Sequence, residues 1–174
     1  MLAQRLAEHE STVTFVDSAE MLALLPDGPH IHKVAGAFPQ ALESQFESLR
    51  ASFDVIVAYS VVQYVFAEGN LWNFFDRCLA LLAEGGELLL GDLPNQIMRQ
   101  RLFASSTGRR LHREYTGRDE PPPAPIFDAQ QMDDSVVLSL LARARAQGFH
   151  AWVVPQSPAL PMSNRREDIL VRRP

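Results

Sequence analysis

The chain has 174 residues but only one cysteine, Cys78, and no apolar run close to the roughly 20 residues of a membrane-spanning helix. A single cysteine excludes a disulfide within the chain and fits a reducing, cytoplasmic environment. No signal peptide is recognisable, and the net charge of −5 argues against nonspecific binding to nucleic acid. We therefore expect a cytoplasmic protein with a small-molecule substrate, and neither nucleic acid nor a membrane as partner. A homodimer is compatible with the sequence.

Motifs for several common chemistries are also missing. Five scattered histidines and one cysteine show none of the ligand spacings of a zinc site, so we expect no metal. The sequence contains neither a G-x-S-x-G nucleophile elbow nor a glycine loop of the phosphate-binding type. The function must therefore be inferred from the order of strands and helices and from the residues at the strand ends.

Apolar segments with the periods of strands and helices alternate along the chain, which indicates an α/β fold. Strands are expected at 12–17, 30–35, 53–60, 88–92, 151–154 and 168–171, and helices at 1–10, 18–25, 41–52, 70–84 and 136–147. The alternation predicts a parallel sheet with helices on both faces. No helix separates the last two strands, so we expect these two to be antiparallel. We interpret 1–174 as one domain with a long polar insertion at 94–133.

The segment 53–60 is the expected centre of this sheet. Val55 to Ala58 is apolar, largely β-branched and free of polar residues, so the strand is predicted to be buried on both faces. Tyr59 and Ser60 follow at its carboxyl end. Ligands of open α/β sheets bind at that edge, so we expect these two residues to contact a ligand.

Four segments together resemble the class I S-adenosylmethionine (SAM)-dependent methyltransferases: Val13–Leu22, Phe53–Val65, Leu81–Asp92 with its Gly85-Gly86, and the closing pair of strands. The resemblance implies a three-layer α/β/α Rossmann-like sheet, mostly parallel with an antiparallel last strand. It implies SAM as the cofactor. A nicotinamide-dependent dehydrogenase would share the acid after the 12–17 strand but not the reversed last strand.

The sequence departs from this family at its beginning. The family's first strand and its G-x-G-x-G loop are absent, and 1–10 is similar to the helix that follows that loop. In the family this strand lies between the second and the fourth, so its absence would leave two strand edges unpaired. We expect an N-terminally truncated domain, or alternatively a genuinely shortened fold, that binds SAM poorly or not at all.

The resemblance assigns cofactor contacts at the ends of three strands. Asp17 would bind the ribose hydroxyls, although an acid at this position can also simply cap the next helix. Ala37 stands where many members of the family have an Asp. Met21 and Phe38 would lie near the adenine or belong to the core. The full set of expected cofactor-binding residues is Asp17, Ser18, Met21, Ala37, Phe38, Tyr59 and Ser60.

Residues after the 53–60 and 88–92 strands are candidates for contact with the methyl acceptor. Gln63 and Tyr64 would line the transfer site, and Asp92 is a candidate catalytic residue. Asn95 would contact the substrate. For Asp92 and Asn95 a turn is the competing interpretation, because Asp, Pro and Asn favour turns.

The stretch 99–118 carries six arginines and His112 against one acid, Glu114. Such a stretch can be a solvated surface. A long insertion at the ligand edge is also typical of a lid, and arginine binds carboxylate or phosphate through its forked guanidinium. We therefore expect Arg109 and Arg113 to bind an anionic acceptor. His112 is a candidate general base or a surface residue.

These observations favour a SAM-dependent methyltransferase that acts on a small anionic acceptor. The alternative is a domain with the same fold that has no catalytic activity and serves as a binding or assembly partner.

Overall fold

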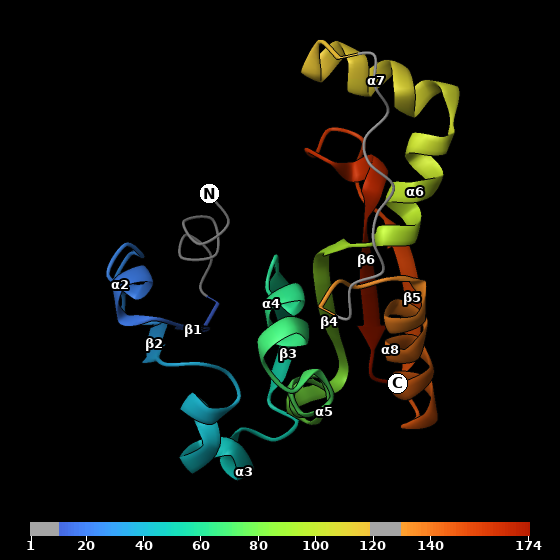
Figure 1. Ribbon diagram of the computed structural model, residues 1–174. Coiled ribbons are helices and arrows are strands. Elements are labelled where there is room, and N and C mark those ends of the chain that lie inside the picture. The colour runs from blue at the N-terminus through green and yellow to red at the C-terminus, as the bar shows by residue number, and fades with distance from the viewer. Residues whose placement is uncertain (1–10, 119–129) are drawn as a thin grey trace. The chain divides into compact units, whose positions relative to one another are not determined.

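The computed structural model describes residues 11–118 and 130–174, and the chain divides into two compact units, 1–49 and 50–174 (Figure 1). The sequence predicted one domain, and each of the two units contains a sheet of its own. The helix expected at 1–10 lies outside the described residues.

The first unit contains a two-stranded parallel sheet, as expected for strands that are linked through a helix. The two strands run side by side in register, from the pair Val13 and Ile31 to the pair Asp17 and Ala35. The helix between them is only one turn long, because Pro26 follows closely and ends the helical segment that was expected at 18–25. Its elements are β1 (Val13–Asp17), α2 (Ala19–Leu22), β2 (Ile31–Ala35), η1 (Gln40–Gln45) and α3 (Phe46–Leu49).

The second unit is built on a four-stranded mixed sheet in the order β3-β4-β6-β5. Strand β3 is parallel to β4, and β6 is antiparallel to both β4 and β5. The antiparallel pairing predicted for the last two strands is thus confirmed. The strands are β3 (Phe53–Tyr59), β4 (Leu82–Pro94), β5 (His150–Pro155) and β6 (Arg166–Arg172), with the short helix η2 (Ser163–Arg165) before β6.

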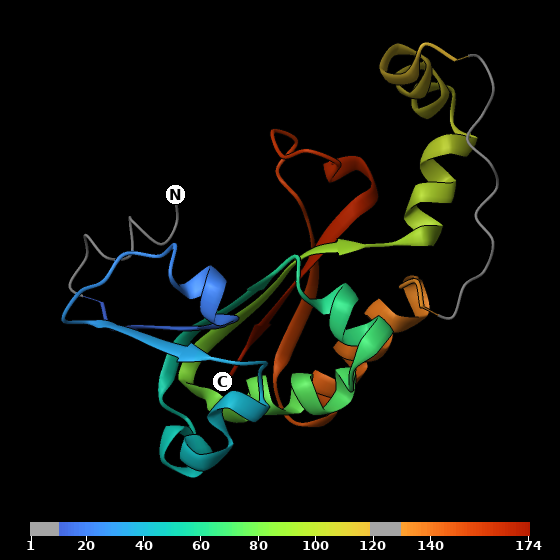
Figure 2. The same ribbon diagram turned by 60° about the vertical axis from the view of Figure 1, so that its left-hand side comes forward.

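Helices α5 (Leu71–Leu81) and α8 (Asp134–Ala146) lie side by side on one face of this sheet (Figure 2). Asn70 caps α5 by accepting a hydrogen bond from the Asn73 amide at 3.0 Å, as its sequence position predicted. The core between these helices and the sheet consists of fully buried side chains: Phe75, Leu79, Leu88, Leu90, Val137, Leu140, Ile169 and Val171. An ion pair of 2.5 Å between Arg143 of α8 and Asp76 joins the two helices.

The opposite face of the sheet carries large exposed apolar side chains. Val55 is 63% exposed, and Val57, Tyr59 and Trp152 are each more than 40% exposed. The prediction that β3 is buried on both faces was therefore wrong. The reason is that α5 and α8 share one face and that β3 is the edge strand of this sheet within the described residues.

Two further differences concern element ends. The helix expected at 70–84 ends at Leu81, because β4 begins at Leu82 and includes the Gly-Gly pair. The insertion expected at 94–133 contains two helices in its described part, α6 (Gln96–Ala104) and α7 (Ser106–Thr116). They follow β4 directly and, together with η2, lie at the end of the sheet that is uppermost in Figure 1. A further short helix, α4 (Val62–Glu68), follows β3.

Over residues 11–118 and 130–174, no helix is both long enough and apolar enough to cross a lipid bilayer. The same residues contain no cluster of three or more histidine, cysteine or acidic side chains arranged to hold a metal ion.

Helix α8 provides a test of the core. Leu140 is fully buried, whereas Leu138 on the same helix is 59% exposed. We expect Leu140→Ala to lower the free energy of unfolding by about 2–5 kcal/mol, because it leaves a cavity. Leu138→Ala should change it by less than about 0.5 kcal/mol. Urea unfolding of both variants measures the difference, and equal losses would contradict this packing.

Candidate active site

The parallel strands β3 and β4 end at the same edge of the sheet, and a residue with left-handed backbone lies near the end of each. Ser60, just after β3, has a φ of 58°, and Asp92 in β4 has a φ of 61°. Left-handed backbone is costly for most residues other than glycine, and residues held in it cluster at functional sites. At Asp92 it coincides with a bulge, since Leu90 pairs with Ile169 but Leu93 pairs with Glu167, one residue out of step. Bulges of this kind redirect a side chain.

The bulge turns the Asp92 carboxylate towards two donors. The Ser60 hydroxyl donates to Asp92 Oδ2 at 2.5 Å, and Arg166 Nη1 donates to the same oxygen at 3.0 Å. Arg166 also donates to the backbone oxygen of Asp92 at 3.1 Å. The ion pair is mostly buried, with 22% and 18% of the two side chains exposed. Ser60 after β3, Asp92 of β4 and Arg166 of β6 are thereby fixed to one another.

A second acid supports this arrangement from β6. Asp168 Oδ1 accepts hydrogen bonds from the Asp92 amide at 2.8 Å and from Gln156 Nε2 at 2.9 Å. We refer to Tyr59, Ser60, Asp92, Gln156, Arg166 and Asp168 as the strand-end cluster.

Tyr59 lies across the neighbouring strand. A Cβ added at Gly91 would stand 2.3 Å from Tyr59 Cδ2, so the close approach of the ring requires glycine there. Loss of hydration around the hydroxyl, followed by the charges of Asp92 and Asp168, raises the pKa of Tyr59 above its ordinary value.

Two amide oxygens, that of Gln156 in the cluster and that of Gln63 beside it, are buried without a hydrogen-bond partner within the described residues. Gln63 Nε2 donates to the Ser60 carbonyl at 3.1 Å, which holds this side chain against the end of β3. Buried acceptors without a donor are costly, so both oxygens are available to an N–H or O–H group of a ligand. Tyr64, on α4, is 63% exposed.

Asn95 serves as the cap of α6. Its Oδ1 accepts from the amides of Ile97 and Met98, and its Nδ2 donates to Asp134 at 2.7 Å and to Glu167 at 2.5 Å. The residue is 2% exposed. The side-chain amide oxygen and nitrogen of Asn95 are both hydrogen-bonded within the protein, so Asn95 acts as a helix cap. Neither group is left for the substrate contact that was expected of this residue.

In the first unit, the expected cofactor residues gather at one edge of the β1-β2 sheet. Asp17 and Ala35 are paired in register, so Ser18 after β1 and Ala37 and Phe38 after β2 leave the sheet at the same end. The Asp17 carboxylate is exposed and accepts the Ser18 amide through Oδ1 at 2.7 Å. Ser18 caps α2 by accepting the Met21 amide at 3.3 Å, and Met21 is 52% exposed.

The candidate residues of the insertion lie on α7, whose packing is against α6. Arg109 donates to the Ala104 carbonyl at 2.7 Å, and Arg113 is exposed. The His112 ring packs edge-on against Phe103, with 5.6 Å between centroids. The structure thus brings Tyr59, Ser60, Asp92 and Gln63 together, and it places His112, Arg109 and Arg113 on a separate element.

Sequence reasoning missed Gln156, Arg166 and Asp168. These residues follow β5 or belong to the start of β6, and an antiparallel strand starts at the edge where its parallel neighbours end. The prediction that the last two strands are antiparallel already places the residues between them at the ligand edge. The polar residues at 156–168 could therefore have been recognised as site candidates from the sequence.

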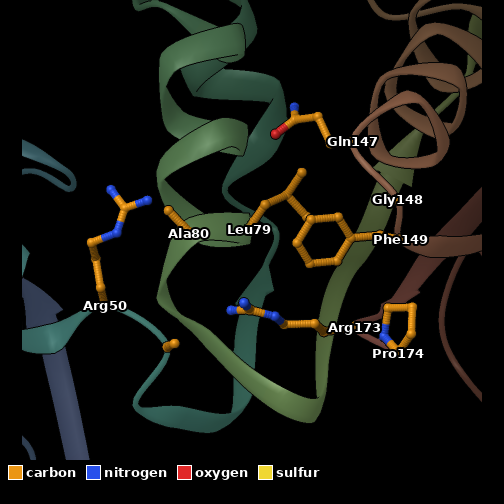
Figure 3. Close-up of a pocket in the computed structure, with 9 residues that line it drawn as sticks. Arg50, Leu79, Ala80, Gln147, Gly148, Phe149, Arg173 and Pro174 are labelled. Carbon is orange, nitrogen blue, oxygen red and sulfur yellow. The ribbon is translucent and has the colours of Figure 1, made fainter.

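A separate pocket of about 340 Å³ lies at the other end of the sheet (Figure 3). It is lined by Arg50, Ala51, Leu79, Ala80, Gln147, Gly148, Phe149, Arg173 and Pro174. Ala51 precedes β3 and Gly148 precedes β5, so this pocket is at the amino ends of these strands, away from the strand-end cluster.

No protein-family model and no curated protein sequence matches the chain. Solved structures do match it in three dimensions. A candidate SAM-dependent methyltransferase from Listeria monocytogenes has a TM-score of 0.54 at 10% identity, over 99% of this chain and 96% of that one. A SAM-dependent methyltransferase from Methanosarcina mazei matches with a TM-score of 0.53 at 16% identity, over 98% of this chain and 86% of that one. A candidate methyltransferase from Bacillus halodurans scores 0.52 at 15% identity, over 99% and 87%.

The chain has the class I methyltransferase fold. Two other matched structures are longer, and the chain spans 65% of each. The methyltransferase fold agrees with the mixed sheet and its antiparallel last strand, while the N-terminal truncation stays a prediction. At sequence identities of 10–16%, the similarity to these proteins concerns the fold alone.

The raised pKa of Tyr59 is open to measurement. Subtracting the alkaline absorbance titration of Tyr59→Phe from that of the wild type should give a midpoint above the ordinary value of about 10. Asp168→Asn, which keeps the shape, should lower this midpoint because it removes a negative charge. Since the folded-state pKa is raised, its contribution to stability is intact below about pH 10 and is lost as pH rises through the folded-state pKa. A midpoint at or below 10 would contradict the arrangement.

Proposed function

We propose that the protein is a SAM-dependent methyltransferase that methylates a small anionic acceptor. The observation that carries the proposal is the strand-end cluster, in which two strained residues hold a carboxylate at the carboxyl edge of a sheet with the methyltransferase fold. Ligands of open α/β folds bind at this edge. Strain at adjacent strand ends and buried acceptors without partners both favour a site for a ligand over a purely structural turn.

The residues of the first unit fit the cofactor. Asp17 uses one carboxylate oxygen for the Ser18 amide, and its other oxygen has no hydrogen bond from any residue that the structure describes. An exposed carboxylate at a strand end can accept bonds from a ribose diol. The exposed Met21 and the partly exposed Phe38 offer apolar surface to a purine. When bound, SAM supplies a methyl group attached to a positively charged sulfur.

The strand-end cluster would act on the acceptor. Asp92 Oδ2 is occupied by Ser60 and Arg166, whereas Oδ1 has no hydrogen bond within the described residues. That oxygen can accept a proton or a hydrogen bond from an acceptor O–H or N–H group. Gln63 Oε1 can orient the same acceptor. Much of the rate enhancement would come from holding the reacting groups in line.

The competing function is a domain without catalytic activity that binds a partner. The observation in its favour is the exposed apolar face around Val55 and Val57. The two functions differ in whether SAM binds.

Calorimetric titration with SAM tests the proposal. We expect weak SAM binding by the chain, and Asp17→Ala should reduce the affinity by about 1–3 kcal/mol, the cost of losing hydrogen bonds to a charged group. Asp27→Ala is the matched control, since Asp27 is an acid of the same unit that is paired with Lys33 and whose side chain is 92% exposed. It should leave SAM affinity unchanged. Absence of any SAM binding would favour the function without catalysis, and equal losses in both variants would remove the role of Asp17.

A further inference from the structure

Three cationic or titratable side chains surround one phenylalanine ring at the ligand edge of the second unit. The guanidinium carbons of Arg99 and Arg165 each lie 5.8 Å from the centroid of Phe103, and His112 packs edge-on at 5.6 Å. Arg99 and Phe103 belong to α6, and Arg165 ends η2, which packs against α6. Two like charges are thus held over the same ring.

Neither guanidinium is neutralised by the protein. Among the residues that the structure describes, Arg99 and Arg165 make no ion pair and no side-chain hydrogen bond, and Arg165 Nε is buried without an acceptor. A buried donor without a partner is costly, and a cation–π contact offsets only part of the cost of bringing two cations together. Burial and the charges of Arg99 and Arg166 lower the pKa of Arg165, in line with this crowding.

The neighbouring acids already have partners. Asp92 is paired with Arg166, Asp134 with Arg101, and Glu114 faces Arg110. Glu167 accepts the hydrogen bond from Asn95. The positive charge of Arg99 and Arg165 is therefore left for a group from outside the described chain.

We propose that Arg99 and Arg165 form a binding site for an oxyanion, a carboxylate or a phosphate group, with Phe103 as its apolar wall. Guanidinium groups bind such anions through paired, charge-assisted hydrogen bonds. Arg165 directly precedes Arg166 of the strand-end cluster, so the proposed site lies at the same end of the sheet as Asp92. If the proposed methyltransferase function holds, on which this step alone rests, the anion is the charged group of the methyl acceptor. The site replaces Arg109 and Arg113 of α7 as the anion-binding residues.

The test uses the full chain and inorganic phosphate as the probe. Phosphate is titrated at constant ionic strength, and the Nε–H signals of the arginine side chains are followed by NMR. The wild type should show saturable shifts that include the Nε–H of Arg165. Arg99→Gln and Arg165→Gln should each raise the phosphate Kd about tenfold or more, the loss typical of charge-assisted hydrogen bonds. Arg110→Gln, which removes an exposed arginine of α7, is the control and should change the Kd by less than about twofold.

Two further variants separate binding from folding. Arg99→Lys and Arg165→Lys keep the charge but lose the forked geometry, so both should bind phosphate more weakly than the wild type and more tightly than the Gln variants. Their Tm without phosphate shows whether Phe103 and η2 keep their packing. If both Gln variants unfold, the phosphate Kd of the Lys variants is compared with that of the wild type instead.

The inference is overturned if phosphate does not saturate at constant ionic strength, or if Arg109→Gln raises its Kd as much as Arg165→Gln does. SAM titration of the same proteins distinguishes this failure from failure of the proposed function. Phosphate binding that depends on Arg99 and Arg165 in a chain that does not bind SAM would support the anion site and refute the methyltransferase proposal. SAM binding in a chain that shows no such phosphate binding would support the methyltransferase proposal and refute the anion site.

Discussion

The pairing of β6 with β4 is the interaction on which both the core and the strand-end cluster of the second unit depend. Because β6 is antiparallel, its buried residues Ile169 and Val171 complete the core beside Leu88 and Leu90, while its first residues reach the edge where β3 and β4 end. The one-residue bulge at this point breaks the ladder next to Asp92. The Asp168 side chain then takes over as acceptor for the Asp92 amide, so the ladder is interrupted without leaving that donor unpaired.

Sequence patterns alone located those strands and helices whose apolar pattern stops at the same residues as the element itself. The strands predicted at 53–60 and 168–171 and the helix capped by Asn70 are present, because apolar periodicity and capping residues are local features. The burial of β3 was not predictable in the same way, since Val55 and Val57 are apolar regardless of which face a helix covers. Nor was the beginning of β4, where Leu82 continues the apolar stripe of α5 but adopts strand geometry because it pairs with Phe53.

The candidate site shows the same division. Tyr59, Ser60 and Asp92 were expected at a ligand edge because strand ends can be located from sequence, and the structure joins Ser60 to Asp92. The role of Asn95 as a cap depends on Asp134 and Glu167, which are distant in sequence, and no local pattern distinguishes it from a substrate ligand. Six arginines between 99 and 118 looked alike in the sequence. Only the fold separates Arg99, beside η2, from Arg110, which faces Glu114 within α7.

Arg165 and Arg166 illustrate how position decides what a charge can do. Arg166 begins β6 and reaches the bulge, where Asp92 neutralises it and Ser60 shares the same carboxylate oxygen. Arg165, one residue earlier, ends the 3-10 helix η2, and its guanidinium lies over the Phe103 ring without an acidic partner among the described residues. A buried ion pair such as that of Arg166 and Asp92 fixes geometry, because both charges are satisfied within the protein. An unpaired guanidinium beside it keeps its full attraction for an anion. This end of the sheet therefore presents a carboxylate that is fixed within the strand-end cluster and, one residue from Arg166 in the chain, a guanidinium with no anionic partner among the described residues.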